Sequence, residues 1–329
     1  MQSNKYLISV VIAVGREDIE ETLDSLENQT MGKNNFEIIL VSELKNLKIS
    51  ETPPIRFIHV NERNPAIKRN IGVKEAKGEL IAFIDDDATA PADWLEKGYS
   101  TLKDNHDFCG LGGPNLIPRN ANKKEQLTDI ILNSSLLGSG HISYSDKHAK
   151  REAKLGEIHL VNLFIRKDVF LRVHGLNESI GYGGEDTEFV YQTKKKLGKR
   201  FFYNSEIYVY HHRREFGWSY IKQRFTLRIN NGKMVWAYPK LYLSNIKFLM
   251  VIMVTIALIM MSFKNPIFLF YIGIFYFLYL SVYTIIEHKD YFPILPIAFF
   301  LHHLTYVAGL FHGLIMGGVK YRITKQIRR

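Results

Sequence analysis

Four apolar residues, Ile81 to Ile84, run directly into three consecutive carboxylates, Asp85, Asp86 and Asp87. An apolar run without alternation is typical of a strand buried on both faces, as in a parallel sheet. The adjacent carboxylates repel one another, and a hard divalent cation with oxygen ligands would relieve that repulsion. Ligands in open α/β sheets also bind beyond the carboxyl ends of the strands. The alternative is a solvated acidic turn that favours the N-terminus of the next helix.

Strand and helix patterns alternate on both sides of this run, which predicts an α/β fold with a largely parallel sheet. No glycine-rich dinucleotide motif follows the first strand, and no phosphate-loop Gly-Lys-Ser/Thr occurs. Their absence argues against a dinucleotide dehydrogenase and a P-loop ATPase. The expected strands are residues 7–14, 36–41, 55–60, 108–114, 158–165 and 201–210; the expected helices are residues 19–29 and 65–77, with Gly78 as a helix stop.

A second acidic motif, Glu185-Asp186, follows Gly183 and Gly184 and begins a predicted helix that reaches Lys196. The glycines allow a tight turn and a close approach of the backbone to a ligand. Together with the earlier carboxylates, the pair indicates acid–base chemistry beside a metal site. The alternative is helix capping, for which one carboxylate is sufficient. The polar stretch at residues 119–157 is predicted to be a long loop, functional or mobile.

A basic segment, His211 to Arg214, follows the last predicted strand. It offers a metal ligand and phosphate-pairing guanidinium groups, or a solvated basic edge that faces lipid headgroups. Arg224 and Arg228 then share one face of a probable helix. Dense tyrosine and tryptophan residues around this helix favour a surface at a membrane interface.

Three apolar segments follow, at residues 248–263, 266–286 and 291–316. The last contains three histidines and has Gly309, Gly313 and Gly317 at four-residue spacing, which suits close helix contact. Basic residues before the first segment and in the C-terminal tail place both ends in the cytoplasm. We therefore predict two crossings and one interfacial or re-entrant segment, the last. No cleavable signal peptide is visible, so we expect the N-terminal part to remain cytoplasmic.

The net charge of +10 is concentrated beside the apolar segments, which favours lipid over nucleic acid as the partner of the basic residues. The single cysteine, Cys109, excludes an internal disulfide and a cysteine-rich metal site.

Read in order, these motifs resemble those of the inverting glycosyltransferases of family 2, which have the GT-A fold, over residues 7–232. The apolar end, with His302, Tyr306, Gly309 and Gly313, is similar to members that build exopolysaccharide or lipid-linked glycans. The resemblance is carried by Ile8–Val14, Lys68-Arg69-Asn70-Ile71-Gly72, Ala76-Lys77-Gly78-Glu79, Phe83–Asp87, Asn162, Gly175-Leu176-Asn177-Glu178 and Gly184-Glu185-Asp186.

The resemblance implies a role for each matching residue. Asp85 and Asp87 would bind Mg or Mn, and Asp186, beside Glu185, would be the catalytic base. His212 would lie near the diphosphate, and Gln223 and Arg224 match a later segment that closes over it; with Asn162, these residues would contact the acceptor or the diphosphate. The nucleotide sugar, linked to UDP or GDP, would contact Ala13, Val14, Gly15, Glu17, Glu43, Arg69, Asn70, Asp85 and Asp86.

Two departures from the family pattern limit what is implied. The turn after the second strand is Val41-Ser42-Glu43-Leu44, without the usual aspartates, which leaves the choice of nucleotide open. The processive signature Gln-x-x-Arg-Trp is also absent, because Gln223-Arg224-Phe225 repeats it only in part. We therefore expect transfer of one sugar and not polymer synthesis.

The resulting expectation is a GT-A, Rossmann-like catalytic domain at residues 1–240, with a nucleotide-sugar half (1–110) and an acceptor half (111–240). Residues 241–329 would form a membrane region of two or three hydrophobic helices and a basic tail. The expected protein is a multi-pass enzyme of the cell membrane that glycosylates a lipid-linked glycan.

Two rival functions remain open. A polyprenyl-phosphate glycosyl synthase would use an acceptor phosphate that is already ionised and needs no base. A membrane scaffold or glycan-binding subunit without catalysis is disfavoured because both carboxylate clusters are intact.

Overall fold

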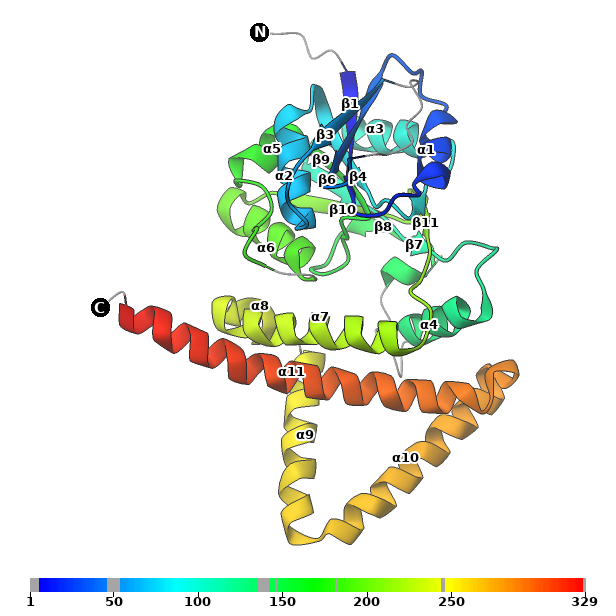
Figure 1. The fold of residues 1–329 in the computed structure, drawn as a ribbon, viewed down its shortest axis with the longest axis vertical. Coiled ribbons are helices and arrows are strands. Elements are labelled where there is room, and N and C mark those ends of the chain that lie inside the picture. Colours follow the sequence, from blue (N-terminus) through cyan, green and yellow to red (C-terminus); the bar gives the residue numbers. More distant parts are fainter. Residues whose placement is uncertain are drawn as a thin grey trace. The chain divides into compact units, whose positions relative to one another are not determined.

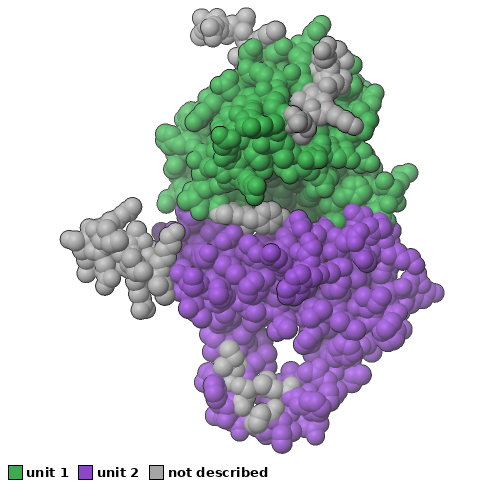
Figure 2. All heavy atoms as spheres, viewed as in Figure 1, with its two compact units in different colours: residues 1–121, 140–181, 185–213 green, residues 122–139, 182–184, 214–329 purple. Residues whose placement is uncertain are grey.

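The computed structural model describes residues 6–45, 54–134, 142–145, 147–180, 183–243 and 246–327. The chain divides into two compact units, coloured separately in Figure 2. Unit 1 consists of residues 1–121, 140–181 and 185–213, and unit 2 of residues 122–139, 182–184 and 214–329. The expected domain boundary at residue 240 stays a prediction.

Unit 1 is built on an eight-stranded sheet with the order β3-β2-β1-β4-β9-β6-β10-β8. Adjacent strands are parallel from β3 to β4 and between β6 and β10, whereas β9 runs antiparallel to both β4 and β6. The expected α/β class with a mostly parallel sheet is therefore confirmed. The strands are β1 (Tyr6–Val14), β2 (Phe36–Ser42), β3 (Ile55–His59), β4 (Gly78–Ile84), β6 (Phe108–Gly112), β8 (Lys150–Glu152), β9 (Asn162–Arg166) and β10 (Arg200–Asn204).

The two faces of this sheet bury two separate hydrophobic cores. On β4, Ile81 and Phe83 enter one core, and the alternating residues Leu80, Ala82 and Ile84 enter the other. A strand covered on both faces needs apolar residues at every position, which is why the run lacks alternation. The first core is covered by α1 (Glu20–Glu27) and α3 (Trp94–Asp104), and the second by α2 (Pro65–Glu75), α5 (Lys167–Arg172) and α6 (Glu185–Leu197) (Figure 1).

A small second sheet lies just past the end of β4. It consists of β5 (Ala88–Thr89), β11 (Val209–His211) and β7 (Asn115–Leu116), in that order. The antiparallel pairing of β11 with β5 sets His211 opposite Ala88. This register brings a histidine from late in the chain beside the acidic triplet.

Three expectations about local structure were wrong. Gly78 is not a helix stop, because α2 ends before it and Gly78 begins β4. A Cβ there would lie 2.6 Å from the Ser9 backbone nitrogen, so glycine is required for the close pairing with β1. The predicted strand over residues 201–210 is two strands, β10 and β11, separated by a turn in which the Asn204 side chain accepts the Glu206 N–H.

The polar stretch at residues 119–157 is also not one long loop. It contains α4 (Lys123–Asn133), the short 3-10 helix η1 (Ile142–Tyr144) and β8. Helix α4 begins with a capping box, in which Asn122 accepts the Glu125 N–H and the Glu125 side chain accepts the Asn122 N–H. This exchange satisfies backbone donors that would otherwise lack a partner at the start of the helix.

Unit 2 is helical and contains, besides α4, the helices α7 (Trp218–Ala237), α8 (Pro239–Leu243), α9 (Ile246–Lys264), α10 (Pro266–Glu287) and α11 (Ile294–Ile327), with the 3-10 turn η2 (Lys289–Tyr291) before α11. Helices α7 and α11 pack along each other (Figure 1). A Cβ on Gly313 would lie 2.1 Å from the Ile229 carbonyl oxygen, and one on Gly309 would lie 2.8 Å from the Phe225 carbonyl oxygen. The expected close helix contact at the spaced glycines is therefore confirmed, and its partner is α7.

Two stretches in the described part of the chain are long and apolar enough to cross a membrane: Phe270–Glu287 in α10 and Ile294–Gly318 in α11. This finding concerns length and composition only. The number of crossings and the cytoplasmic position of unit 1 stay predictions.

Candidate active site

The three carboxylates after β4 have three different sets of partners. Asp86 Oδ2 accepts the backbone N–H groups of Gly15 and Arg16, at 2.6 and 3.2 Å. Burial and the neighbouring carboxylates raise the pKa of Asp86, although the Gly15 N–H opposes this. The middle aspartate therefore fixes the loop that follows β1, which the resemblance assigns to the nucleotide.

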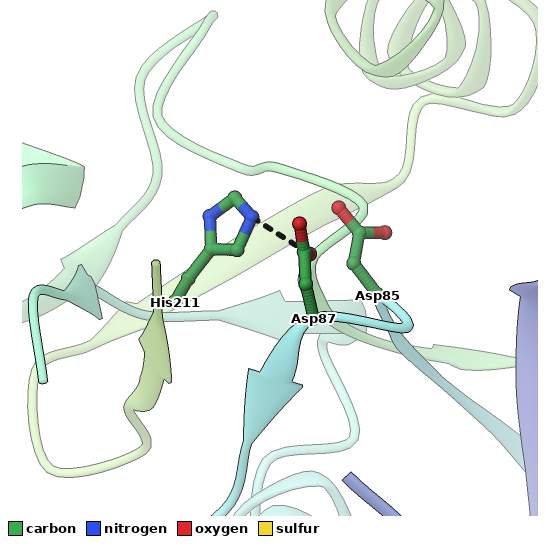
Figure 3. Close-up of side chains that lie close together, drawn as sticks. All are labelled: Asp85, Asp87 and His211. Atoms are coloured by element: carbon green, nitrogen blue, oxygen red, sulfur yellow. Dashed lines mark ion pairs between the residues drawn. The ribbon is translucent and has the colours of Figure 1, made fainter. Parts of the chain in front are cut away.

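Asp85 and Asp87 point toward a common region with His211 (Figure 3). One ligand atom from each of the three residues lies within 4.8 Å of the others. His211 Nε2 is 3.0 Å from Asp87 Oδ1. Burial alone would raise the pKa of Asp87, but the hydrogen bond and charge of His211 lower it. Two carboxylates and an imidazole form a donor set that suits a divalent cation.

Asp85, Asp87 and His211 are called the metal-type cluster below. Arg69, on α2, connects this cluster to the rest of the site. Its Nη2 donates to Asp85 Oδ1 at 2.6 Å, and the residue is only 6% exposed. Within the described part of the chain, Arg69 Nε is buried and has no hydrogen-bond partner. Buried polar atoms are rarely left unpaired in native proteins, so this atom is available to a ligand.

The second acidic pair begins α6. The Asp186 Oδ2 atom is 2.9 Å from His159 Nδ1, while Oδ1 accepts the Thr187 N–H at 2.6 Å. Burial would raise the pKa of Asp186, but the hydrogen bond and charge of His159 lower it.

The neighbouring Glu185 behaves differently. Burial and the charge of Asp186 raise the pKa of Glu185 to about 7. The charge of Asp85 adds to this rise, and the charge of Arg69 opposes it. Among the described residues, Glu185 Oε2 is buried without a hydrogen-bond partner. The two acidic motifs, a hundred residues apart in the sequence, therefore lie near each other within unit 1. Arg69 interacts with both, through a hydrogen bond to Asp85 and through its charge on Glu185.

The C-terminal ends of β1 and β2 are joined by a buried lysine that the sequence analysis did not single out for a role. Lys68 Nζ donates to the Val14 carbonyl oxygen at 2.6 Å and forms an ion pair with Glu43. Burial opposes ionisation of Glu43, but Lys68 lowers its pKa overall. Of the other residues expected at the nucleotide, Ala13 is half-buried and Glu17 is exposed beyond the end of β1.

Two asparagines expected at ligands, Asn162 and Asn70, are buried and hydrogen-bonded to the backbone of distant segments. Asn162 is 1% exposed; its Nδ2 donates to the Pro114 and Ile207 carbonyls, and its Oδ1 accepts the Trp94 Nε1–H.

The Asn70 side chain accepts the Leu176 N–H and donates to the Leu176 carbonyl and to Glu178. Because both amides are buried and have partners in the protein, they join segments that are distant in the sequence. The ligand contacts expected of Asn70 and Asn162 stay predictions.

Of the residues expected at the diphosphate, His212 belongs to unit 1, and Gln223 and Arg224 belong to unit 2. His212 Nε2 is 4.0 Å from Glu21 Oε2, and His212 lines a small cavity of about 60 Å³ together with Asp86 and Asp87. Gln223 and Arg224 belong to α7 in unit 2, where the Arg224 guanidinium lies 5.3 Å from the centre of the Tyr220 ring. His159 was missing from the expected site, and His211 was expected only as part of the basic segment that offers a metal ligand. His211 stands next to His212 in a basic segment already singled out, but no local pattern marks His159.

Comparison with known families decides the identity of the fold. The model of the family described as "Glycosyl transferase family 2" matches residues 9–170, from β1 into α5. The chain belongs to glycosyltransferase family 2. The expected GT-A fold is confirmed together with the family, and folds of this kind typically bind a divalent metal.

Two relatives of this glycosyltransferase come from Haloferax volcanii. A glucosyl-dolichyl phosphate glucuronosyltransferase is 28% identical over 173 residues, covering 49% of this chain and 53% of the relative. Glycosyltransferase AglE is 24% identical over 261 residues, covering 75% and 79%. The chain thus spans about half the length of the first relative. Among solved structures, GalNAc-T7 with UDP, GalNAc and Mn²⁺ has a TM-score of 0.49 at 16% identity, covering 71% of this chain and 48% of that one.

Proposed function

We propose that the chain is a metal-dependent, inverting glycosyltransferase that moves one sugar from a nucleotide sugar to a lipid-linked glycan acceptor at a membrane. The observation that carries this proposal is the proximity of two unlike acidic groups in unit 1. One group, Asp85 and Asp87 with His211, has the donor set of a cation site. The other, Glu185 and Asp186, has the charged groups needed for proton transfer.

Asp85, Asp87 and His211 would hold Mg or Mn. When bound, the cation would neutralise charge on the diphosphate of the nucleotide sugar. Of the two metals, Mn suits the imidazole better, since Mg prefers oxygen ligands throughout. The buried Arg69 Nε, without a partner among the described residues, adds a donor that a phosphate oxygen would satisfy.

In the proposed transfer, the acceptor hydroxyl gives its proton to the Asp186 carboxylate. Its oxygen forms a bond to the anomeric carbon from the face opposite the diphosphate. The bond between that carbon and the phosphate oxygen breaks, and the nucleoside diphosphate departs with the electron pair. Attack from the opposite face inverts the anomeric configuration.

The acceptor class rests on two supporting observations. One relative is named for transfer to glucosyl-dolichyl phosphate, a sugar already attached to a lipid. The described helices of unit 2 include two stretches with the length and composition of membrane spans. Both support a lipid-linked acceptor and a membrane location for this chain.

The experiment compares acceptors and variants with purified protein. We expect transfer from a UDP- or GDP-sugar to a polyprenyl-diphosphate-linked sugar in the presence of Mn, and none to polyprenyl phosphate. Asp186→Asn should bind the nucleotide sugar normally and lose roughly 10²–10⁴-fold in kcat, the range for loss of a general base. Asp87→Ala should lose metal-dependent binding of the nucleotide sugar, whereas Asp104→Asn, at an exposed carboxylate on α3, should change neither property.

Three results would contradict the proposal. Full activity of Asp186→Asn removes the base from the mechanism. Unchanged binding by Asp87→Ala removes that residue from the metal site. Transfer to polyprenyl phosphate alone identifies the rival synthase, whose acceptor needs no base.

A further inference from the structure

His159 is placed against Asp186 by three elements of unit 1. The residue precedes β9, its ring is partly buried with the side chain 23% exposed, and its Nδ1 is 2.9 Å from Asp186 Oδ2. One face of the imidazole is stacked on the Tyr144 ring of η1, with ring centres 6.0 Å apart and planes inclined by 25°. Stacking and hydrogen bonding together fix the direction in which the imidazole points.

The Tyr144 ring is in turn packed against Arg213. The Arg213 guanidinium lies 4.8 Å from the centre of the Tyr144 ring, and Arg213 donates to the Asn115 side chain at 3.0 Å. Arg213 is 6% exposed, so this support is largely excluded from water. The series from β7 to α6 is therefore continuous: Asn115, Arg213, Tyr144, His159 and Asp186.

Both oxygens of the Asp186 carboxylate receive a hydrogen bond from the protein. Oδ2 faces His159, and Oδ1 accepts from the Thr187 backbone N–H at 2.6 Å and from its hydroxyl at 3.3 Å. A carboxylate held by donors on both sides has one orientation, and Oδ2, which faces His159 alone in these hydrogen bonds, keeps a lone pair for a further proton. The adjacent Glu185 has no such donor on Oε2 among the described residues.

We propose that His159 is a positioning residue, which holds the Asp186 carboxylate ionised and in one orientation for the proton transfer. This inference rests on the proposed function. It concerns a residue that no sequence motif indicates, and it explains why the second member of the Glu185-Asp186 pair is the one that stays ionised.

The charges around the pair agree with the geometry. Burial lowers the pKa of His159, but the hydrogen bond and charge of Asp186 outweigh this and raise it to about 9; Tyr144 adds to the rise and Arg213 opposes it. The imidazole is therefore a cation at neutral pH, and it lowers the pKa of Asp186. Burial and the charges of Asp186 and Asp85 raise the pKa of Glu185 to about 7, although the charge of Arg69 opposes this. Two adjacent carboxylates with separated pKa values are typical of acid–base sites.

Two substitutions separate the orientation from the charge. His159→Phe removes both the N–H donor and the positive charge, whereas His159→Asn keeps an N–H donor near the position of Nδ1 without the charge. We expect His159→Phe to lower kcat about 10²-fold, the cost of a misplaced catalytic group. His159→Asn should recover most of that loss at high pH.

The pH profile supplies the readout that a merely structural role would not move. Without the cation, Asp186 remains protonated to a higher pH, so the acid limb of kcat/KM should move up by about one unit or more in both variants. The KM for the nucleotide sugar should change less than about twofold, because the metal-type cluster is separate from this pair. His106→Asn, the same change at an exposed histidine after α3, is the matched control and should leave the profile unchanged.

A second measurement does not depend on activity. Titration of the His159 imidazole by NMR should give a pKa near 9 in the unaltered protein, falling toward 6.5 in Asp186→Asn. A pKa near 6.5 in the unaltered protein overturns the inference, as does an equal loss of kcat in both His159 variants with an unmoved acid limb.

The same measurements distinguish the failure of this inference from the failure of the proposed function. If the unaltered protein transfers no sugar while His159 titrates as expected, the function is refuted, and with it the role of the pair in catalysis. If transfer occurs and Asp186→Asn abolishes it, but the His159 variants keep the normal profile, only the role of His159 is refuted.

Discussion

The substitution Gly313→Ala tests the close packing of α7 against α11 within unit 2. A Cβ on Gly313 would lie 2.1 Å from the Ile229 carbonyl oxygen and 2.8 Å from its carbonyl carbon. Both atoms belong to the backbone of α7, so no side-chain rotation can relieve the contact. The two helices must move apart by more than about 1 Å to restore ordinary van der Waals separation.

Two opposing effects set the magnitude. Forcing an extra carbon into a packed interface costs about 1–3 kcal/mol. Replacing glycine by alanine within a helix contributes about 1 kcal/mol in the other direction. We therefore expect a net loss of up to about 2 kcal/mol. The control is Gly273→Ala in α10, where nothing in the described structure lies within 4 Å of the added carbon, so only the favourable effect remains.

The assay is thermal unfolding of both variants in the same detergent. At about 2–4 °C per kcal/mol for a chain of this size, Gly313→Ala should lower Tm by several degrees, while Gly273→Ala should leave Tm unchanged or raise it slightly. Equal Tm values for the two variants would refute the argument, because they would show that the approach of the backbones at Gly313 is not close.

Three further predictions concern unit 1. His211→Ala should weaken Mn binding by at least about 10-fold, measured by calorimetry, since a cation site loses one of three candidate ligands. Asn162→Leu should lower the free energy of unfolding by about 2–4 kcal/mol in a denaturant titration, because it unpairs two buried carbonyls and an indole N–H. Because folding raises the pKa of His159 from 6.5 to about 9, its stabilisation is complete below pH 6.5 and lost as the pH rises toward 9. The free energy of unfolding should therefore fall by about 3 kcal/mol across that interval in the unaltered protein, and Tm should fall with it. Both changes should be much smaller in His159→Asn.

The central part of the fold could be predicted because burial leaves a direct trace in the sequence. Ile81 to Ile84 had to be apolar at every position, since β4 contributes alternating side chains to two different cores. The carboxylates that follow could be placed at the edge of the sheet for the same reason. The spacing of Gly309 and Gly313 was likewise informative, because only small residues permit backbones to approach so closely.

Other residues could not be assigned because their roles depend on contacts between distant segments. Asn162 matches a family motif, but whether an asparagine faces a ligand or joins buried carbonyls is decided by the strands around it. His211 reaches Asp87 only through the register of β11 with β5, which no local pattern determines. His159 has no distinguishing neighbours in the sequence, and its significance becomes visible only when α6 is seen to begin beside it.

The contacts of the acidic triplet bear on whether charge repulsion implies a metal site. Repulsion among three adjacent carboxylates was the first reason to expect a cation, yet each carboxylate has its own donor in the protein: Arg69 for Asp85, backbone N–H groups for Asp86, and His211 for Asp87. Repulsion alone therefore does not require a metal. The stronger argument is directional, because Asp85 and Asp87 converge with an imidazole while Asp86 faces the loop after β1. Partners that merely neutralised charge would not need to separate the middle carboxylate from the outer two, whereas a site that binds a cation and a nucleotide at once requires that separation.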